Sequence, residues 1–351
     1  MAAQSALWGK VRSGGIGTLA VMGMTKNTGK TVTLNHLLAC AAADQLAVGV
    51  TSIGRDGEAR DQVFQFPKPP VTVWPGMLVA TARDTLSRAK VATRPVCSTG
   101  LDSPMGEIVV VRAQEHGAME IAGASRSTDL TALIARLRQC GCDLVVLDGA
   151  LGRSHHASPA VADAVVLATG AAIGGGIQDV IRKTRDRLRI LGVPQADDAT
   201  CQLCAPVFSE GGVGVWDRCG VLLFRAQIPT LNSAAALMQQ AQADIKTIAV
   251  NGAVGRQLWR ALLELATFKP GLTVVVHDGT RLFVDASDVA ALARLKGHVL
   301  AYRGIRIAGV TVNPFAPQGG DFDARMLRHA AREAFPQLEV TDVVLEPFET
   351  A

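Results

Sequence analysis

Short apolar runs alternate with amphipathic segments along most of the chain. Apolar runs at residues 17–24, 47–54, 143–150 and 162–171 have the length and composition of buried strands. Segments 29–46, 128–141 and 177–192 carry apolar residues at helical spacing. This alternation predicts an α/β fold, with a mostly parallel sheet and helices on both of its faces.

Residues 64–124 interrupt this pattern. They contain several strand-like runs and few helical ones, which predicts an irregular β-rich insertion at the sheet edge. Residues 194–221 are weakly patterned, and we expect a linker with an irregular β element there. The expected division is therefore a nucleotide-binding part at 1–193, the linker at 194–221, and a C-terminal α/β part at 222–351 that completes the same sheet.

Composition excludes several classes of protein. The 351 residues are 48% hydrophobic and 19% charged, with a net charge of +4, which argues against disorder and against a nucleic-acid-binding module. Residues 160–177 include an aspartate and several glycines, so no membrane span is expected.

Seven cysteines, with no signal-peptide pattern at the N-terminus, predict a cytoplasmic protein with reduced thiols. Cys201 and Cys204 have metal-ligand spacing, but idle buried thiols are an open alternative.

The stretch "GMTKNTGKT", residues 23–31, follows the first predicted strand and precedes the first predicted helix. It resembles a phosphate-binding loop, although five residues rather than four separate Gly23 from Gly29. Gly29 would let backbone N–H groups approach phosphates, Lys30 would contact the β- and γ-phosphates, and Thr31 would bind Mg²⁺. The sequence therefore predicts an ATP and Mg²⁺ site. Its other expected nucleotide-binding residues are Thr25, Lys26, Asn27, Thr28 and Val32.

Three further positions extend this site. Asp148 ends the apolar run "LVVLD" and is expected to bind Mg²⁺ as a Walker B carboxylate. Asp56, or Glu58 nearby, follows the second strand and would hold Mg²⁺ or orient water; a solvated Asp-Gly turn is the alternative. Asn313 ends a late strand and would pair with the base edge, or else begin an Asn-Pro turn. Lys30, Asp56 and Asp148 are the expected catalytic residues.

The loop, the strand ending in Asp148 and the late strand "VTVN" together resemble the dethiobiotin synthetase and MinD-like (SIMIBI) branch of P-loop NTPases. Members of that branch often carry a signature lysine five residues before the loop lysine. Thr25 occupies this position here, and Lys26 is one residue away. This departure argues against Lys26 acting across a dimer, although the resemblance still allows a homodimer.

The segments 26–35, 52–58 and 147–171 are similar to a narrower family, KamB, the reactivase subunits of lysine 5,6-aminomutase. The resemblance implies an ATPase that restores a cobalamin-dependent aminomutase by exchanging its damaged cofactor. It also implies a second, MutS-like reactivase subunit as partner. The residues alone indicate only a switch driven by nucleotide hydrolysis.

Two other functions fit the same motifs. One is an ATP-dependent ligase or kinase for a small metabolite, like dethiobiotin synthetase. The other is an adaptor that binds nucleotide without hydrolysing it. A metal-insertion GTPase is disfavoured because the chain lacks the N-K-x-D motif that recognises guanine.

Overall fold

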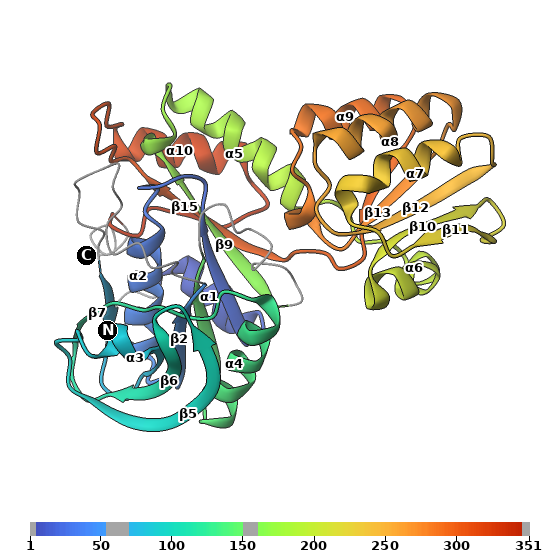
Figure 1. The fold of residues 1–351 in the computed structure, drawn as a ribbon. Coiled ribbons are helices and arrows are strands. Elements are labelled where there is room, and N and C mark those ends of the chain that lie inside the picture. Colours follow the sequence, from blue (N-terminus) through green and yellow to red (C-terminus); the bar gives the residue numbers. More distant parts are fainter. Residues whose placement is uncertain (1–4, 54–69, 150–160, 346–351) are drawn as a thin grey trace. The chain divides into compact units, whose positions relative to one another are not determined.

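The structure is a computed structural model that describes residues 5–53, 70–149 and 161–345. The chain divides into two units, of which unit 1 comprises Met1–Thr184 and Arg306–Ala351. Unit 2 comprises Arg185–Ile305, so it is inserted in the sequence of unit 1 (Figure 1).

Unit 1 is built on a large sheet with strand order β16-β15-β9-β1-β8-β2-β4-β6-β5. Its strands are β1 (Thr18–Gly23), β2 (Val48–Ser52), β4 (Leu78–Ala82), β5 (Thr93–Ser103), β6 (Gly106–Ala113), β8 (Leu144–Asp148), β9 (Ala164–Gly170), β15 (Ile307–Asn313) and β16 (Val340–Thr341). Neighbouring strands from β16 to β4 pair in parallel, whereas β6 is antiparallel to both β4 and β5. The mostly parallel sheet is therefore confirmed.

The predicted β-rich insertion is also present at the sheet edge. Besides β4, β5 and β6, this region contributes β3 (Val71–Val73) and β7 (Gly117–Met119), which pair with each other as a small antiparallel ribbon. An antiparallel edge suits this segment, because short turns can join its strands without crossover helices.

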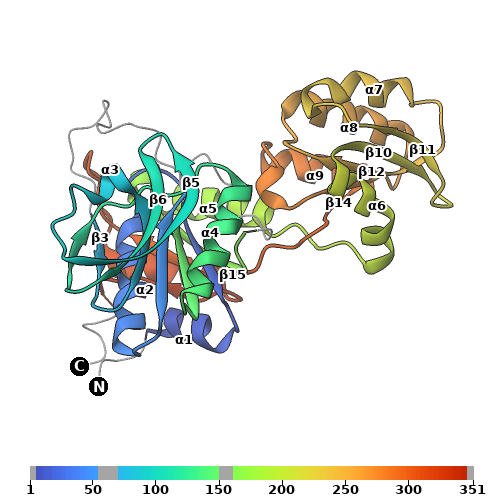
Figure 2. The ribbon, with the colours of Figure 1, turned by 60° about the horizontal axis from the view of Figure 1, so that its bottom comes forward.

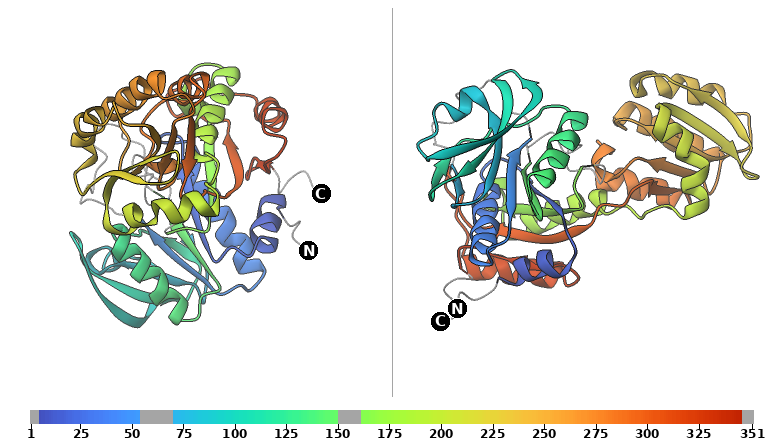
Figure 3. Two further views of the ribbon diagram at one scale, coloured as in Figure 1. Left: turned by 90° about the vertical axis from the view of Figure 1, so that its right-hand side faces the viewer. Right: turned by 90° about the horizontal axis from the view of Figure 1, so that it is seen from below.

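Helices cover both faces of the unit 1 sheet. They are α1 (Ala6–Ser13), α2 (Lys30–Ala43), α3 (Arg83–Leu86), α4 (Ser127–Gln139) and α10 (Ala324–Ala334), with a 3₁₀ turn η2 (Ala171–Ile173). Helix α5 (Ile177–Leu191) begins in unit 1 and ends in unit 2. Leu34 of α2 packs in one core cluster with Val50 of β2. Gly49, the residue before Val50, instead faces Leu137 of α4. Successive strand residues point to opposite faces, so α2 and α4 lie on opposite sides of the sheet (Figure 3).

Unit 2 has its own sheet, with strand order β11-β10-β12-β13-β14. Its elements are α6 (Asp198–Glu210), β10 (Gly212–Asp217), β11 (Leu222–Ala226), η3 (Thr230–Asn232), α7 (Ser233–Gln239), β12 (Ile245–Asn251), α8 (Arg256–Phe268), β13 (Thr273–Val276), η4 (Gly279–Arg281), α9 (Ala286–Arg294) and β14 (His298–Ala301). Trp259 and Leu262 of α8 pack on one face, and Cys204 and Val207 of α6 pack on the other. Figure 2 shows helices α8 and α6 beside this sheet. Among the described residues, no helix is both long and apolar enough to cross a bilayer.

This arrangement differs from the expected division of the chain. Within residues 222–351, only β15 and β16 join the large sheet, whereas β11 to β14 belong to the separate sheet of unit 2. Residues 194–221 contain a β element, β10, as expected, but helix α6 stands where a linker was expected. Asp197 caps α6 by accepting a hydrogen bond from Thr200 N. The internal Pro206 and the weak apolar periodicity of α6 hide this helix in the sequence.

Candidate functional site

The loop from Gly23 to Thr31 connects the carboxyl end of β1 to the start of α2. The neighbouring strands β8 and β9 are parallel to β1, and β15 is parallel to β9, so all four strands end at this edge of the sheet. Ligands of open α/β sheets bind outside the carboxyl ends of the strands. The loop, Asp148 and Asn313 therefore meet where the fold class places its ligands.

The backbone of the loop requires glycine at two places. Gly29 precedes α2 with a φ of 85°, in the left-handed region. A Cβ at Gly23 would lie 2.9 Å from Thr28 Oγ1 and 3.1 Å from the carbonyl oxygen of Thr25. The first-turn N–H groups of α2 have no partners within the helix, and they point out of its N-terminus. A helix start with free N–H groups and the positive end of the helix dipole suits an anion such as a phosphate.

Internal hydrogen bonds hold the loop closed. Thr28 Oγ1 donates to the carbonyl oxygen of Thr25 at 2.9 Å, and Thr25 Oγ1 donates to that of Lys26 at 3.0 Å. Met24 N donates to the carbonyl oxygen of Ala168 in β9 at 2.9 Å. The loop is thus tied to itself and to the sheet, although Lys26, Asn27 and Val32 remain exposed.

Lys30 and Asp148 form an ion pair across the site. Lys30 Nζ contacts Asp148 Oδ1, and the two side chains are only 17% and 6% exposed. Charges that are largely shielded from water attract each other more strongly than charges at the surface. The expected closeness of these two residues, which are 118 positions apart in sequence, is therefore present in the structure.

Oxygen atoms suited to Mg²⁺ lie beside this pair. Thr31 is 6% exposed, and within the described part of the chain its hydroxyl has no hydrogen-bond partner. Mg²⁺ is commonly bound through one or two carboxylates together with phosphate oxygens. The described residues contain no group of three or more His, Cys, Asp or Glu side chains that could hold a metal. Thr31 and Asp148 supply a hydroxyl and a carboxylate oxygen, ligand types that Mg²⁺ accepts together with phosphate oxygens. Asp56 and Glu58 lie outside the described residues.

Asn313 lies against the loop from the end of β15. Its Nδ2 donates to the carbonyl oxygen of Asn27 at 3.0 Å, and its Oδ1 accepts from Phe315 N at 3.2 Å. Gly170 at the end of β9 was not among the expected site residues. A Cβ there would collide with the backbone oxygen of Asn313, so Gly170 allows β15 to approach behind the loop. The glycine that ends the strand "AVVLATG" is the sequence signal for this role.

The cysteine pair Cys201 and Cys204 lies in α6. Cys204 is fully buried, and burial raises the pKa of its thiol to about 12. The Cys201 thiol donates to the carbonyl oxygens of Ala196 and Tyr302, both at 3.6 Å. Metal ligation requires thiolates, so these contacts favour the alternative of neutral thiols, with Cys204 buried and Cys201 half-buried.

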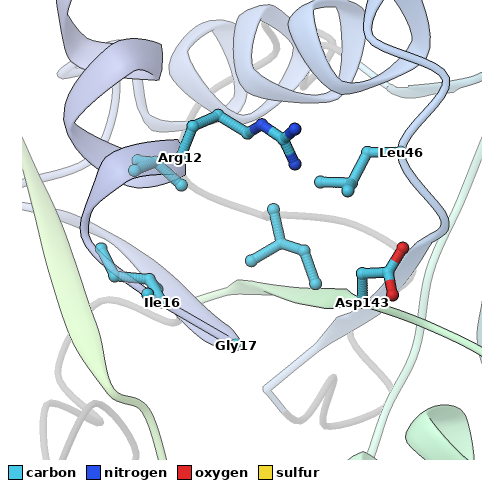
Figure 4. Close-up of a pocket in the computed structure, with 8 residues that line it drawn as sticks. Arg12, Ile16, Gly17, Leu46 and Asp143 are labelled. Carbon is cyan, nitrogen blue, oxygen red and sulfur yellow. The ribbon is translucent and has the colours of Figure 1, made fainter.

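A separate pocket of about 230 Å³ lies at the amino ends of β1 and β8. Arg12, Ile16, Gly17, Leu46 and Asp143 are among its lining residues (Figure 4). These residues precede their strands or lie in α1, at the edge of the sheet opposite the loop. The pocket is therefore distinct from the site around Lys30.

No protein-family model and no curated protein matches this chain. The case for a function consequently depends on the geometry of the loop and on the motifs in the sequence.

Proposed function

We propose that this protein is a Mg²⁺-dependent ATPase of the P-loop type. The observation that carries the proposal is the ion pair between Lys30, at the start of α2, and Asp148, at the end of the adjacent strand β8. A lysine that follows a left-handed glycine at a helix start, beside a strand-terminal carboxylate, is the arrangement expected for phosphate and Mg²⁺.

Each residue has a distinct role in this proposal. The loop amides and Lys30 would bind the β- and γ-phosphates. Thr31 and Asp148 would hold Mg²⁺, with Asp56 as the proposed second carboxylate. When bound, the ion supplies positive charge that neutralises the phosphate oxygens. The absence of an N-K-x-D motif favours ATP over GTP.

The proposed biological role is reactivation of a cobalamin-dependent aminomutase of the lysine 5,6-aminomutase type. Its support is the resemblance of three segments to KamB, at residues 26–35, 52–58 and 147–171. In this role ATP hydrolysis would drive the exchange of damaged cofactor, together with a MutS-like partner subunit.

Measuring ATP and GTP hydrolysis in the presence of Mg²⁺ tests both the proposed ATPase activity and the proposed reactivase role. Wild type would be compared with Lys30→Ala, with and without a lysine 5,6-aminomutase. The matched control is Lys10→Ala, which removes an exposed lysine of α1. We expect ATP turnover that rises when the mutase is added, is lost in Lys30→Ala and is unchanged in Lys10→Ala.

The other outcomes separate the alternatives. ATP turnover that does not change when the mutase is added, but rises with a small metabolite, would favour a ligase or kinase over a reactivase. Tight nucleotide binding without turnover under any condition would indicate an adaptor. Equal turnover in wild type and Lys30→Ala would exclude this loop as the catalytic site.

A further inference from the structure

The carboxamide of Asn313 is engaged with the protein itself. Nδ2 donates to the carbonyl oxygen of Asn27 at 3.0 Å, and Oδ1 accepts from Phe315 N at 3.2 Å. A carboxamide has two N–H donors and two acceptor lone pairs. One of each is used, and the bond to Asn27 turns the amide toward the loop.

The carbonyl that Asn313 holds belongs to a residue with a left-handed backbone. Asn27 has a φ of 63°, a conformation that is uncommon outside glycine, although asparagine adopts it more often than most residues. Such a conformation persists when surrounding contacts fix it. The hydrogen bond from Asn313 is a contact of this kind, and it spans 286 positions of sequence.

Asn313 also packs against the second left-handed residue. A Cβ built on Gly29 would lie 3.0 Å from Asn313 Cβ and 3.5 Å from Asn313 Nδ2. The side chain therefore contacts the backbone on both sides of Thr28. This is the part of the loop whose N–H groups would face a phosphate.

The strand that carries Asn313 is itself fixed. Thr311 Oγ1 and Thr33 Oγ1 form a buried hydrogen bond of 2.7 Å, which ties β15 to α2 one turn after the loop. Gly170 brings β9 against the backbone of Asn313. Asn313 thus projects from a fixed strand onto a loop that contains two left-handed residues.

We propose that Asn313 is a positioning residue that holds the loop in its phosphate-binding conformation. This inference rests on the proposed function and gives Asn313 a role other than reading the base. A loop that reaches this conformation only part of the time binds its ligand more weakly, in proportion to the competent fraction. The loss would be the same for every ligand that carries the polyphosphate.

The test compares affinities for MgATP, MgGTP and Mg²⁺-tripolyphosphate, which has no base. Asn313→Ala removes both hydrogen bonds. Asn313→Asp is nearly isosteric; it keeps an acceptor for Phe315 N but cannot donate to Asn27. Gln318→Ala is the matched control, because Gln318 is an exposed amide in the same segment.

We expect Asn313→Ala to lower the affinity for all three ligands by a similar factor of about ten, the effect of losing one or two hydrogen bonds. Asn313→Asp should lower the three affinities at least as much, because its negative charge also repels the polyphosphate. Gln318→Ala should bind like wild type. The KM for ATP should rise while kcat at saturating ATP changes less than twofold, because bound phosphates order the loop. A partly unfolded variant would instead lose kcat in proportion to its inactive fraction.

Two results would overturn the proposal. One is unchanged tripolyphosphate affinity with an altered ratio of ATP to GTP affinity, which would make Asn313 a base-reading residue. The other is that Asn313→Ala binds all three ligands as tightly as wild type does.

Hydrogen exchange of residues 24–33 without ligand separates this proposal from the proposed function. If wild type binds none of the three ligands, the ATPase proposal fails, yet the exchange still tests the loop. Faster exchange in both Asn313 variants than in Gln318→Ala would uphold the positioning role. Equal exchange would refute it.

Discussion

Gly29 shows how strictly single residues determine this site. Its φ of 85° costs an L-residue about 1–2 kcal/mol, and a Cβ there would also press on Asn313. We predict that Gly29→Ala lowers the free energy of unfolding by at least this amount and weakens ATP binding more than tenfold. Urea unfolding and equilibrium binding measure the two effects.

Gly9 provides the matched control for this substitution. It lies within α1, and a Cβ there would meet nothing within 4 Å. Gly9→Ala should therefore stabilise the protein by about 0.5–1 kcal/mol through helix propensity. If the two alanine variants behaved alike, the strain assigned to Gly29 would be wrong.

Two buried thiols predict a loss of stability in alkali. Burial raises the pKa of Cys142 and that of Cys204 to about 12, from an ordinary value of 9.0. Above pH 9 the unfolded chain loses these protons while the folded protein keeps them, so the free energy of unfolding falls between pH 9 and 12. The fall should be shallower in a Cys142→Ala/Cys204→Ala variant; identical slopes would contradict the assignment.

The site residues differ in how far sequence alone could predict them. Gly29, Lys30 and Thr31 are contiguous, and Asp148 ends an apolar strand, so local pattern was sufficient to pair the loop with this carboxylate. The contact of Asn313 with Asn27 depends on the docking of β15 beside β9, which no local pattern encodes. The prediction therefore stopped at contacts that depend on which strands lie side by side in the sheet.

Between elements, a buried hydroxyl pair joins α2 to β15. Thr33 and Thr311 are 1% and 2% exposed and share a hydrogen bond of 2.7 Å. Replacing one of them by valine leaves the other hydroxyl unpaired, which should cost about 1–3 kcal/mol. The double valine variant should recover much of that loss, as a double-mutant cycle would show. Strictly additive losses would mean that the two hydroxyls do not interact.

The elements themselves were predicted unevenly. Strands β1, β2, β8 and β9 follow from their apolar runs, and the antiparallel edge follows from the break in helical pattern after residue 64. Helix α6 was missed because Pro206 and polar residues dilute its periodicity. Its Asp197 cap was the available signal.

In the whole molecule, two units with separate cores replace the single sheet expected from sequence. Strands β12 to β14 have the same apolar pattern as the strands of unit 1. Periodicity identifies a strand but not the sheet that it joins, so the insertion of unit 2 before β15 was not foreseen.

Separate cores predict separable unfolding. Leu262 and Leu137 are fully buried, the first in unit 2 and the second in unit 1. Replacing each by alanine should cost about 2–5 kcal/mol in its own unit. Calorimetry should show two unfolding transitions. Leu262→Ala should lower the midpoint temperature of one of them and leave the ATP affinity unchanged. MgATP should raise only the midpoint temperature that Leu137→Ala lowers. A single transition whose midpoint both variants shift would contradict this division.

The most direct test of the central claim is calorimetric binding of MgATP to wild type and to Lys30→Ala. A phosphate-binding loop at residues 23–31 predicts one site per chain whose affinity falls at least a hundredfold in Lys30→Ala. Omitting Mg²⁺ should weaken binding to wild type as well. No binding to wild type, or equal binding to both proteins, would contradict the assignment of this loop as a nucleotide site.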